Sequence, residues 1–187
     1  MMWRMPKQLL IVYHSMTGGT RQMAEAARAG AQAEADLSAG EAGEGDDGGV
    51  SALPALHVRL LHAAEAGPRD VLQADGYLFA TPENLAAISG AMKDFFDRSY
   101  YPVLDAVQGR PYASLVCAGS DGQNAARQIA RIATGWRLKA VAEPLIVCTH
   151  AQTTEAILAP KQIEAEALDA CRALGESLAA GLVLGIF

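Results

Sequence analysis

The chain has 187 residues, of which 51% are hydrophobic, and its formal net charge is −6. This length and composition indicate a globular protein with a sizeable core, organised as one domain over residues 1–187, and they exclude a disordered chain. The acidic residues between Glu34 and Gly49 have no basic neighbours and account for the whole net charge, so the rest of the chain is neutral. A nucleic-acid binder needs a basic surface, and this sequence offers none.

The cysteines and the chain ends narrow the class further. Cys117, Cys148 and Cys171 are widely spaced, which predicts reduced core thiols in a cytoplasmic protein. The four histidines lack metal-ligand spacing, so no metal site is predicted. Residues 1–7 are too short and mixed for a signal peptide. The apolar tail 178–187 is about half as long as a membrane-spanning helix, so we expect it to dock on the protein or on a second subunit.

Apolar runs alternate with helix-forming runs along the chain. They predict strands over 9–13, 57–61, 76–80, 112–118 and 144–148, with helices after each of them. Residues 36–54 are acidic and glycine-rich without an apolar period, which predicts a flexible insertion. Five strands alternating with helices predict an α/β fold, in which a parallel sheet is covered by helices on both faces. With right-handed crossovers, the natural strand order is 2-1-3-4-5.

The turn after the first strand has the composition of an anion site. Glycines let the backbone approach a ligand, the first helical N–H groups lack partners, and the helix dipole favours negative charge. Hydroxyl groups add donors to a phosphate. The alternative is a capped helix that binds nothing, and Arg21 is equally suited to neutralising a phosphate or to facing solvent. The residues of this first loop are Ser15, Met16, Thr17, Gly18, Gly19 and Thr20.

Two further loops are expected to meet the first. In open α/β sheets, ligands bind beyond the carboxyl ends of the strands at the point where the strand order reverses. The alternatives are a proline-terminated strand in the second loop and a plain helix N-cap, Asp121 or Asn124, in the third. The second loop, after the third strand, contains Thr81, Pro82, Glu83, Asn84 and Leu85, and the third loop, after the fourth strand, contains Gly119, Ser120, Asp121 and Gly122.

These three loops together resemble those of a known group of flavoproteins. The spacing Ser-x-Thr-Gly-x-Thr of the first loop resembles the phosphate loop of the flavodoxin superfamily, which holds the FMN phosphate. The Thr-Pro-Glu turn and the helix 90–98 resemble the second flavin loop of FMN reductases and of flavodoxin-like NAD(P)H:quinone oxidoreductases. The glycine-rich third loop is similar to that of the quinone oxidoreductases. The resemblance covers residues 8–136 and implies a three-layer flavodoxin-like sandwich, with FMN bound by the three loops.

The resemblance also implies an activity. An FMN-dependent oxidoreductase of this kind passes electrons from NAD(P)H to a quinone, a nitro compound or a similar small acceptor. Because the flavin carries the chemistry, no catalytic side chain is expected. Two alternatives stay open, a flavodoxin-like one-electron carrier and a flavodoxin-fold binding module without FMN. Carriers present acidic surface around the flavin, whereas the acids here concentrate in one segment, which favours the enzyme.

The sequence departs from flavodoxins at the aromatic residues. No pair of aromatic residues matches the one that sandwiches the flavin in flavodoxins. Tyr100, Tyr101 and Trp136 are the candidates, and for each of them an ordinary place in the core or at an interface is favoured. The two tyrosines and the apolar tail offer surface for a homo-oligomer.

Overall fold

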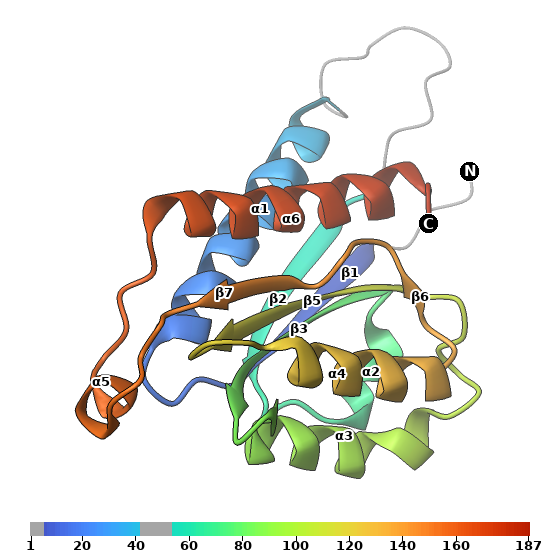
Figure 1. The fold of residues 1–187 in the computed structure, drawn as a ribbon. Helices are drawn as coiled ribbons and strands as arrows, with labels where there is room; N and C mark the ends of the chain where they lie inside the picture. Colours follow the sequence, from blue (N-terminus) through green and yellow to red (C-terminus); the bar gives the residue numbers. More distant parts are fainter. Residues whose placement is uncertain (1–5, 42–53) are drawn as a thin grey trace, which may run out of the picture.

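The computed structural model describes residues 6–41 and 54–187, and Figure 1 shows its ribbon. In chain order the elements are β1 (Lys7–Tyr13), α1 (Gly19–Glu41), β2 (Leu56–His62), α2 (Pro68–Gln73), β3 (Gly76–Asn84), β4 (Ala87–Ile88), α3 (Gly90–Val103), β5 (Pro111–Ala118), α4 (Gln123–Gly135), β6 (Lys139–Ala140), β7 (Leu145–Cys148), α5 (Thr154–Leu158) and α6 (Ala165–Leu184).

The sheet has the predicted order. It runs β2-β1-β3-β5, with β6 and β7 both paired to β5. β6 pairs with the start of β5 and β7 with its end, so together they form one interrupted fifth strand. These pairs are all parallel, which confirms the order 2-1-3-4-5. β4 was not predicted. It pairs antiparallel with the end of β3, because β3 continues through Pro82 to Asn84 instead of ending at the proline.

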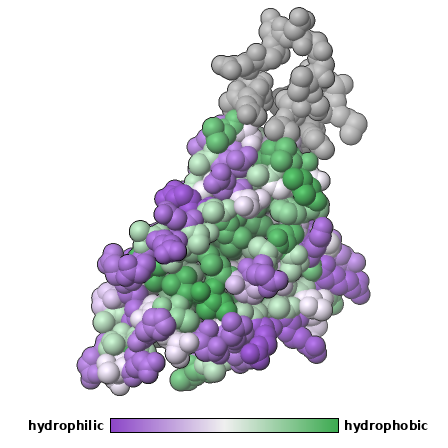
Figure 2. Space-filling model, turned by 45° about the horizontal axis from the view of Figure 1, so that its top comes forward, coloured by the Kyte–Doolittle hydropathy of each residue, from purple (hydrophilic) through white to green (hydrophobic). Residues whose placement is uncertain are grey.

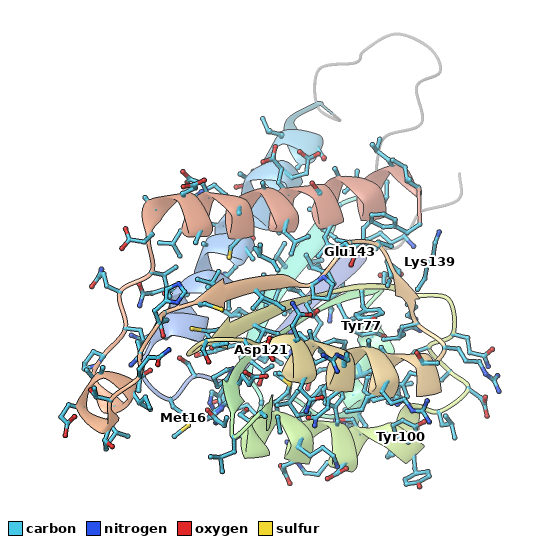
Figure 3. All side chains as sticks on the ribbon, in the orientation of Figure 1. Met16, Tyr77, Tyr100, Asp121, Lys139 and Glu143 are labelled. Atoms are coloured by element: carbon cyan, nitrogen blue, oxygen red, sulfur yellow. The ribbon has the colours of Figure 1, made fainter. Side chains whose placement is uncertain are left out.

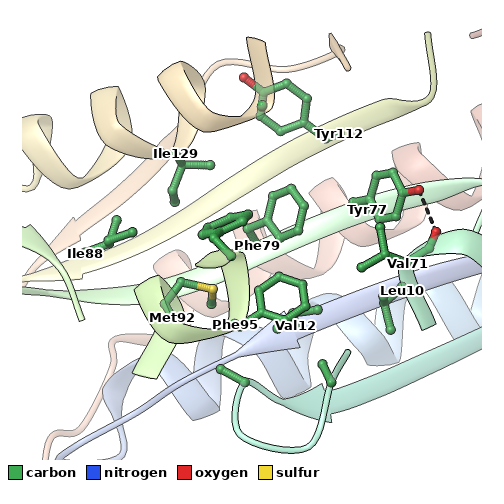
Figure 4. Packing of buried hydrophobic residues seen from close by; sticks show 14 of the residues in the cluster. Leu10, Val12, Val71, Tyr77, Phe79, Ile88, Met92, Phe95, Tyr112 and Ile129 are labelled. Carbon is green, nitrogen blue, oxygen red and sulfur yellow. Dashed lines mark hydrogen bonds between the residues drawn. The ribbon is translucent and has the colours of Figure 1, made fainter. Parts of the chain in front are cut away.

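Helices cover both faces of this sheet, as predicted (Figure 1). On one face α1 and α6 pack against the alternate strand residues that include Leu9 and Leu78. On the other face α2, α3 and α4 enclose an aromatic cluster around Phe79. Figure 4 shows this cluster, in which the buried Tyr77 hydroxyl donates a 2.8 Å hydrogen bond to the Val71 carbonyl. Burial on both faces explains why the strands read as continuous apolar runs.

The two helices of the first face cross at unusually close range. A Cβ atom on Gly175 of α6 would collide with the backbone carbonyl of Ala27 in α1, and one on Gly30 would collide with the carbonyl of Arg172. Only glycine permits this approach of two helix backbones. The crossing positions α1, and therefore the loop that precedes it.

The structure corrects the predicted start of the insertion and shows where the apolar tail lies. The insertion was expected to begin at residue 36, but α1 continues to Glu41, because Ala35 and Ser38 keep a small buried face along the helix. Residues 42–53 of the expected insertion lie outside the described residues. The apolar tail docks on the protein itself, since Leu182 is buried and the Phe187 ring lies against Gly181.

The surface is mixed in character. Figure 2 shows apolar areas interspersed with hydrophilic residues on the face that it draws. Within residues 6–41 and 54–187, no helix has the length and apolar character needed to cross a membrane.

Candidate functional site

A cavity of about 620 Å³ opens at the carboxyl ends of β1, β3 and β5, where the three predicted loops meet. Most of the predicted residues of the three loops line it. The lining consists of Ser15, Met16, Thr17, Thr20, Pro82, Glu83, Asn84, Leu85, Ala86, Cys117, Ala118, Gly119, Ser120, Ala151, Ile157, Leu158 and Lys161.

The first loop has an ordered backbone at the start of α1. Gly18 has φ +89°, a left-handed conformation that glycine adopts without strain, and its N–H donates to Ser15 Oγ at 3.1 Å. α1 then begins at Gly19, so its first N–H groups lie at this loop. Thr20 is only 1% exposed, and within the described residues its Oγ1 has no nitrogen or oxygen partner; its polar neighbour is the Cys117 thiol. Burying a hydroxyl without a hydrogen-bond partner costs free energy. A ligand that accepts a hydrogen bond from this hydroxyl would recover that cost.

The second loop is a tight hairpin at the rim of the cavity. Leu85 and Ala86 both have positive φ, 51° and 57°, which is rare for residues other than glycine. The Leu85 side chain is fully exposed at the tip, and Asn84 Nδ2 lies 3.0 Å from Met16 Sδ across the cavity mouth. Strained backbone of this kind concentrates at functional sites.

Thr81 does not line the cavity, although it was predicted to bind the ligand. It is fully buried, and its Oγ1 accepts from the Ser89 N–H at 3.1 Å and donates to the Pro82 carbonyl at 2.9 Å. The side chain therefore fixes the base of the hairpin.

Glu83 lines the cavity and also has a structural role that was not predicted. Its carboxylate accepts hydrogen bonds from the N–H groups of Gly122, at 2.8 Å, and Ala125, at 3.4 Å. Glu83 thus caps the N-terminus of α4, where Gly122 itself has φ +78° and no side chain to serve as a cap. This contact ties the second loop to the third.

The third loop contributes less than expected. Gly119 and Ser120 line the cavity, whereas Asp121 and Gly122 do not. Asp121 is exposed and does not cap α4, because Glu83 occupies that position. Asn124 is also no cap, since its amide bonds to the carbonyl of Ala86 in the hairpin.

Sequence reasoning missed the wall supplied by the segment after β7. Ile157 and Leu158 of α5 line the cavity, followed by Lys161. The available signal was an isolated apolar pair within an otherwise polar segment. Cys117 was also missed, because its apolar strand context indicated only a core residue.

The charged groups around the cavity are largely engaged. The Lys161 ammonium donates to three carbonyls at the end of α5, and Arg21 lies 3.8 Å from Glu25 on the exposed side of α1. Arg21 also borders a smaller hollow beside the first loop, together with Ser15 and Thr17.

Two titratable groups near the first loop are held in their neutral forms. Burial raises the pKa of the Cys117 thiol, although the neighbouring Thr20 hydroxyl and the Lys161 charge oppose this rise. Burial, followed by the nearby His62, lowers the pKa of His14. His14 lies outside the cavity lining and brings no positive charge to it at neutral pH. Among residues 6–41 and 54–187, no group of three or more side chains is placed to hold a metal ion.

The candidate aromatic residues lie elsewhere. Trp136 is fully buried, stacks on Tyr100 with ring centroids 6.0 Å apart and donates from Nε1 to the Tyr100 carbonyl. In Figure 3, Tyr100 and Met16 lie on opposite sides of the lower part of the view. Tyr101 is exposed beside Tyr100. None of these three residues lines the cavity, whose lining combines aliphatic and polar side chains and contains no aromatic residue among the described ones.

The sheet order, the glycine- and hydroxyl-containing loop at the N-terminus of α1 and the cavity at the carboxyl ends of the strands define a flavodoxin-like protein. Residues 9–153 match the family model of NADPH-dependent FMN reductase, and the chain belongs to that family.

Individual relatives agree with this placement. The NAD(P)H dehydrogenase (quinone) of Acidithiobacillus ferrooxidans is 33% identical over 93 residues, which are 49% of this chain and 46% of that protein. A flavodoxin of Aquifex aeolicus is 33% identical over 113 residues, 60% of this chain and 49% of that protein. The chain thus spans about half the length of these relatives. A solved flavodoxin from the domain Archaea superposes with a TM-score of 0.68 at 16% identity, covering 94% of this chain and 98% of that one, and shows the shared fold.

Proposed function

We propose that the protein is an FMN-dependent oxidoreductase that takes electrons from NAD(P)H and passes them to a small acceptor such as a quinone or a nitro compound. The observation that carries this proposal is Thr20, whose buried hydroxyl lies in the cavity at the N-terminus of α1 and makes no hydrogen bond to a nitrogen or oxygen atom of the described residues. Membership of the FMN reductase family supports the same assignment.

The residues present fit an FMN molecule. The hydroxyls of Ser15, Thr17 and Thr20 and the first N–H groups of α1 would hold the phosphate, as helix N-termini commonly do. No carboxylate lies in the first loop to oppose it. The flavin ring would lie between the second and third loops, against aliphatic walls. The volume of about 620 Å³ is typical of small-molecule sites, which span roughly 300–1,000 Å³.

When bound, FMN supplies two-electron exchange between NAD(P)H and the acceptor. The titratable groups in the lining are all committed to other tasks. The Glu83 carboxylate accepts from the N-terminus of α4, the Lys161 ammonium donates to α5, and the Cys117 thiol stays protonated. The described lining therefore offers no free acid or base, and the chain's own role would be to bind, orient and shield the flavin.

A second candidate, a one-electron carrier, is favoured by the flavodoxin of Aquifex aeolicus among the relatives. The two candidates differ in their donor. An enzyme is reduced directly by NAD(P)H, whereas a carrier receives its electrons from a protein partner.

The experiment is a turnover assay on FMN-loaded protein with NADPH or NADH and a soluble quinone. We expect oxidation of the nicotinamide that depends on both FMN and quinone. If FMN binds but neither nicotinamide is oxidised faster than with free FMN, the carrier assignment replaces the enzyme.

A further inference from the structure

The segment of residues 154–163, called here the wall segment, forms one side of the cavity and rests on the first loop. It comprises α5 and the residues that lead to α6 (Figure 1). The family match ends at residue 153, so the wall segment lies outside the part of the chain that the family model covers. We propose that Gln22, on the first turns of α1, is a positioning residue that holds the wall segment against the phosphate loop.

Gln22 uses both ends of its amide to join the two segments. Its Nε2 donates to the carbonyls of Gly18, at 3.1 Å, and Lys161, at 2.7 Å. Its Oε1 accepts from the N–H of Ile163 at 3.2 Å. A direct backbone bond, from the Lys161 N–H to the Thr17 carbonyl at 2.8 Å, completes the junction. Three of these hydrogen bonds reach the wall segment, two from the Gln22 side chain and one from the backbone of Thr17. The fourth, to the Gly18 carbonyl, holds the Gln22 side chain to the first loop.

Lys161 in turn is hydrogen-bonded to α5. Its ammonium donates to the carbonyls of Ala156, Ile157 and Ala159, at 2.7, 2.9 and 2.6 Å. These are carbonyls that a helix leaves without partners at its C-terminus. The position of Lys161, fixed by Gln22, thus sets the position of the short helix that lines the cavity.

Little else holds α5 in place. The helix has no buried residue, and Ile157 and Leu158 are 51% and 66% exposed. An element with few buried contacts opens at low free-energy cost, so its hydrogen bonds decide how often it is closed. Gln22 is therefore expected to control α5 and Lys161 more strongly than packing does, whereas Ile163, at the end of the wall segment, is also held by the core, where it is only 5% exposed.

The packing beneath the wall segment provides a chemical reporter of its position. A Cβ atom built on Gly19 would lie 2.7 Å from Cys117 Sγ, 3.3 Å from Lys161 Cβ and 3.4 Å from Ile163 Cδ1. Cys117 thus lies beside the start of α1 and next to the wall segment, and it is only 8% exposed. When the wall segment loosens, reagents gain access to this thiol.

For the proposed function, the wall segment would retain FMN by closing one side of its site. This part of the inference rests on the assignment of FMN to the cavity. The attachment of the wall segment by Gln22 does not depend on that assignment, because it is measured in protein without any ligand.

The test variant is Gln22→Leu, which keeps the size of the side chain and removes its three hydrogen bonds. The matched control is Gln32→Leu on the same helix, where the amide donates only to Asp36 at 2.8 Å, away from the cavity. In ligand-free protein we expect hydrogen exchange at the amides of Lys161 and Ile163 to be about tenfold faster in Gln22→Leu. The control variant should match the wild type.

Alkylation of Cys117 by iodoacetamide, followed by peptide mass spectrometry, gives an independent readout. We expect it to be several-fold faster in Gln22→Leu than in the wild type and the control. If neither exchange nor alkylation changes, Gln22 does not position the wall segment. If Gln22→Leu fails to fold, hydrogen exchange in the wild type tests the proposal. Exchange at the amides of Lys161 and Ile163 as fast as at exposed loop amides would then overturn it.

Dissociation of FMN, followed by flavin fluorescence after dilution, then tests retention. We expect dissociation about tenfold faster from Gln22→Leu than from the wild type and from Gln32→Leu. A loosened wall segment with unchanged dissociation would refute its role in retention. A wild type that binds no FMN would refute the proposed function, while the exchange and alkylation results would still decide the role of Gln22.

Discussion

Removal of the Glu83 carboxylate should destabilise the protein, because the N-terminus of α4 would lose its cap. A charge-assisted hydrogen bond contributes about 1.5–3 kcal/mol, and a negative charge at a helix N-terminus adds about 0.3–1 kcal/mol. Glu83 makes one short bond, to Gly122, and one long bond, to Ala125. We therefore expect Glu83→Ala to lower the free energy of unfolding by about 2 kcal/mol, and Glu83→Gln, which keeps an oxygen acceptor, by about 1 kcal/mol.

The assay is urea unfolding followed by circular dichroism, with thermal unfolding as a second measurement. For a chain of this size, a loss of about 2 kcal/mol corresponds to a midpoint lowered by about 4–8 °C. The matched control is Asp121→Ala, which removes a carboxylate from the same end of α4 without removing a hydrogen bond, and it should cost less than about 1 kcal/mol. An equal cost for the two alanine variants would refute the capping assignment, because charge alone would then explain both.

Four further predictions concern the first loop, the helix crossing and His14. Thr17→Ala and Thr20→Val should each weaken FMN binding by roughly 10- to 150-fold and leave riboflavin binding unchanged, measured by fluorescence titration. Thr20→Val should change the stability of the ligand-free protein little, since the buried hydroxyl that it removes bonds to no nitrogen or oxygen atom of the described residues. Gly175→Ala should lower the free energy of unfolding by more than about 2 kcal/mol, because its Cβ collides with the Ala27 carbonyl; an unchanged urea midpoint would contradict this. Burial lowers the pKa of His14 in the folded protein below its ordinary value of 6.5. The free energy of unfolding should therefore be highest above pH 6.5 and should decrease as the pH falls through the lower pKa of the folded state. His14→Asn should make the free energy of unfolding depend less steeply on pH in this range.

The strand order and the place of the site were predictable because their signals are local. A buried parallel strand reads as a short apolar run, and the loop after it reads as glycines and hydroxyls. Topology then brings the carboxyl ends of β1, β3 and β5 together, so three separate loops can be assigned to one cavity.

The finer roles depend on contacts between distant residues, which no local pattern records. Glu83 accepts from Gly122, 39 residues later at the start of α4, and its sequence context suggested only a ligand contact. Gln22 contacts residues 139 and 141 positions away. Trp136 satisfies its N–H within the core, whereas its sequence position alone was equally compatible with a ligand site. α5 is too short to show an apolar period, and residues 36–41 continue α1 on small side chains that resemble a loop composition.

The central claim is that the cavity holds FMN by its phosphate at the N-terminus of α1. The most direct measurement is a titration of ligand-free protein with FMN and with riboflavin, followed by quenching of flavin fluorescence. The account predicts binding of one FMN per chain, with riboflavin bound at least tenfold more weakly because it lacks the phosphate. Equal affinity for the two flavins, or no binding of either, would contradict it.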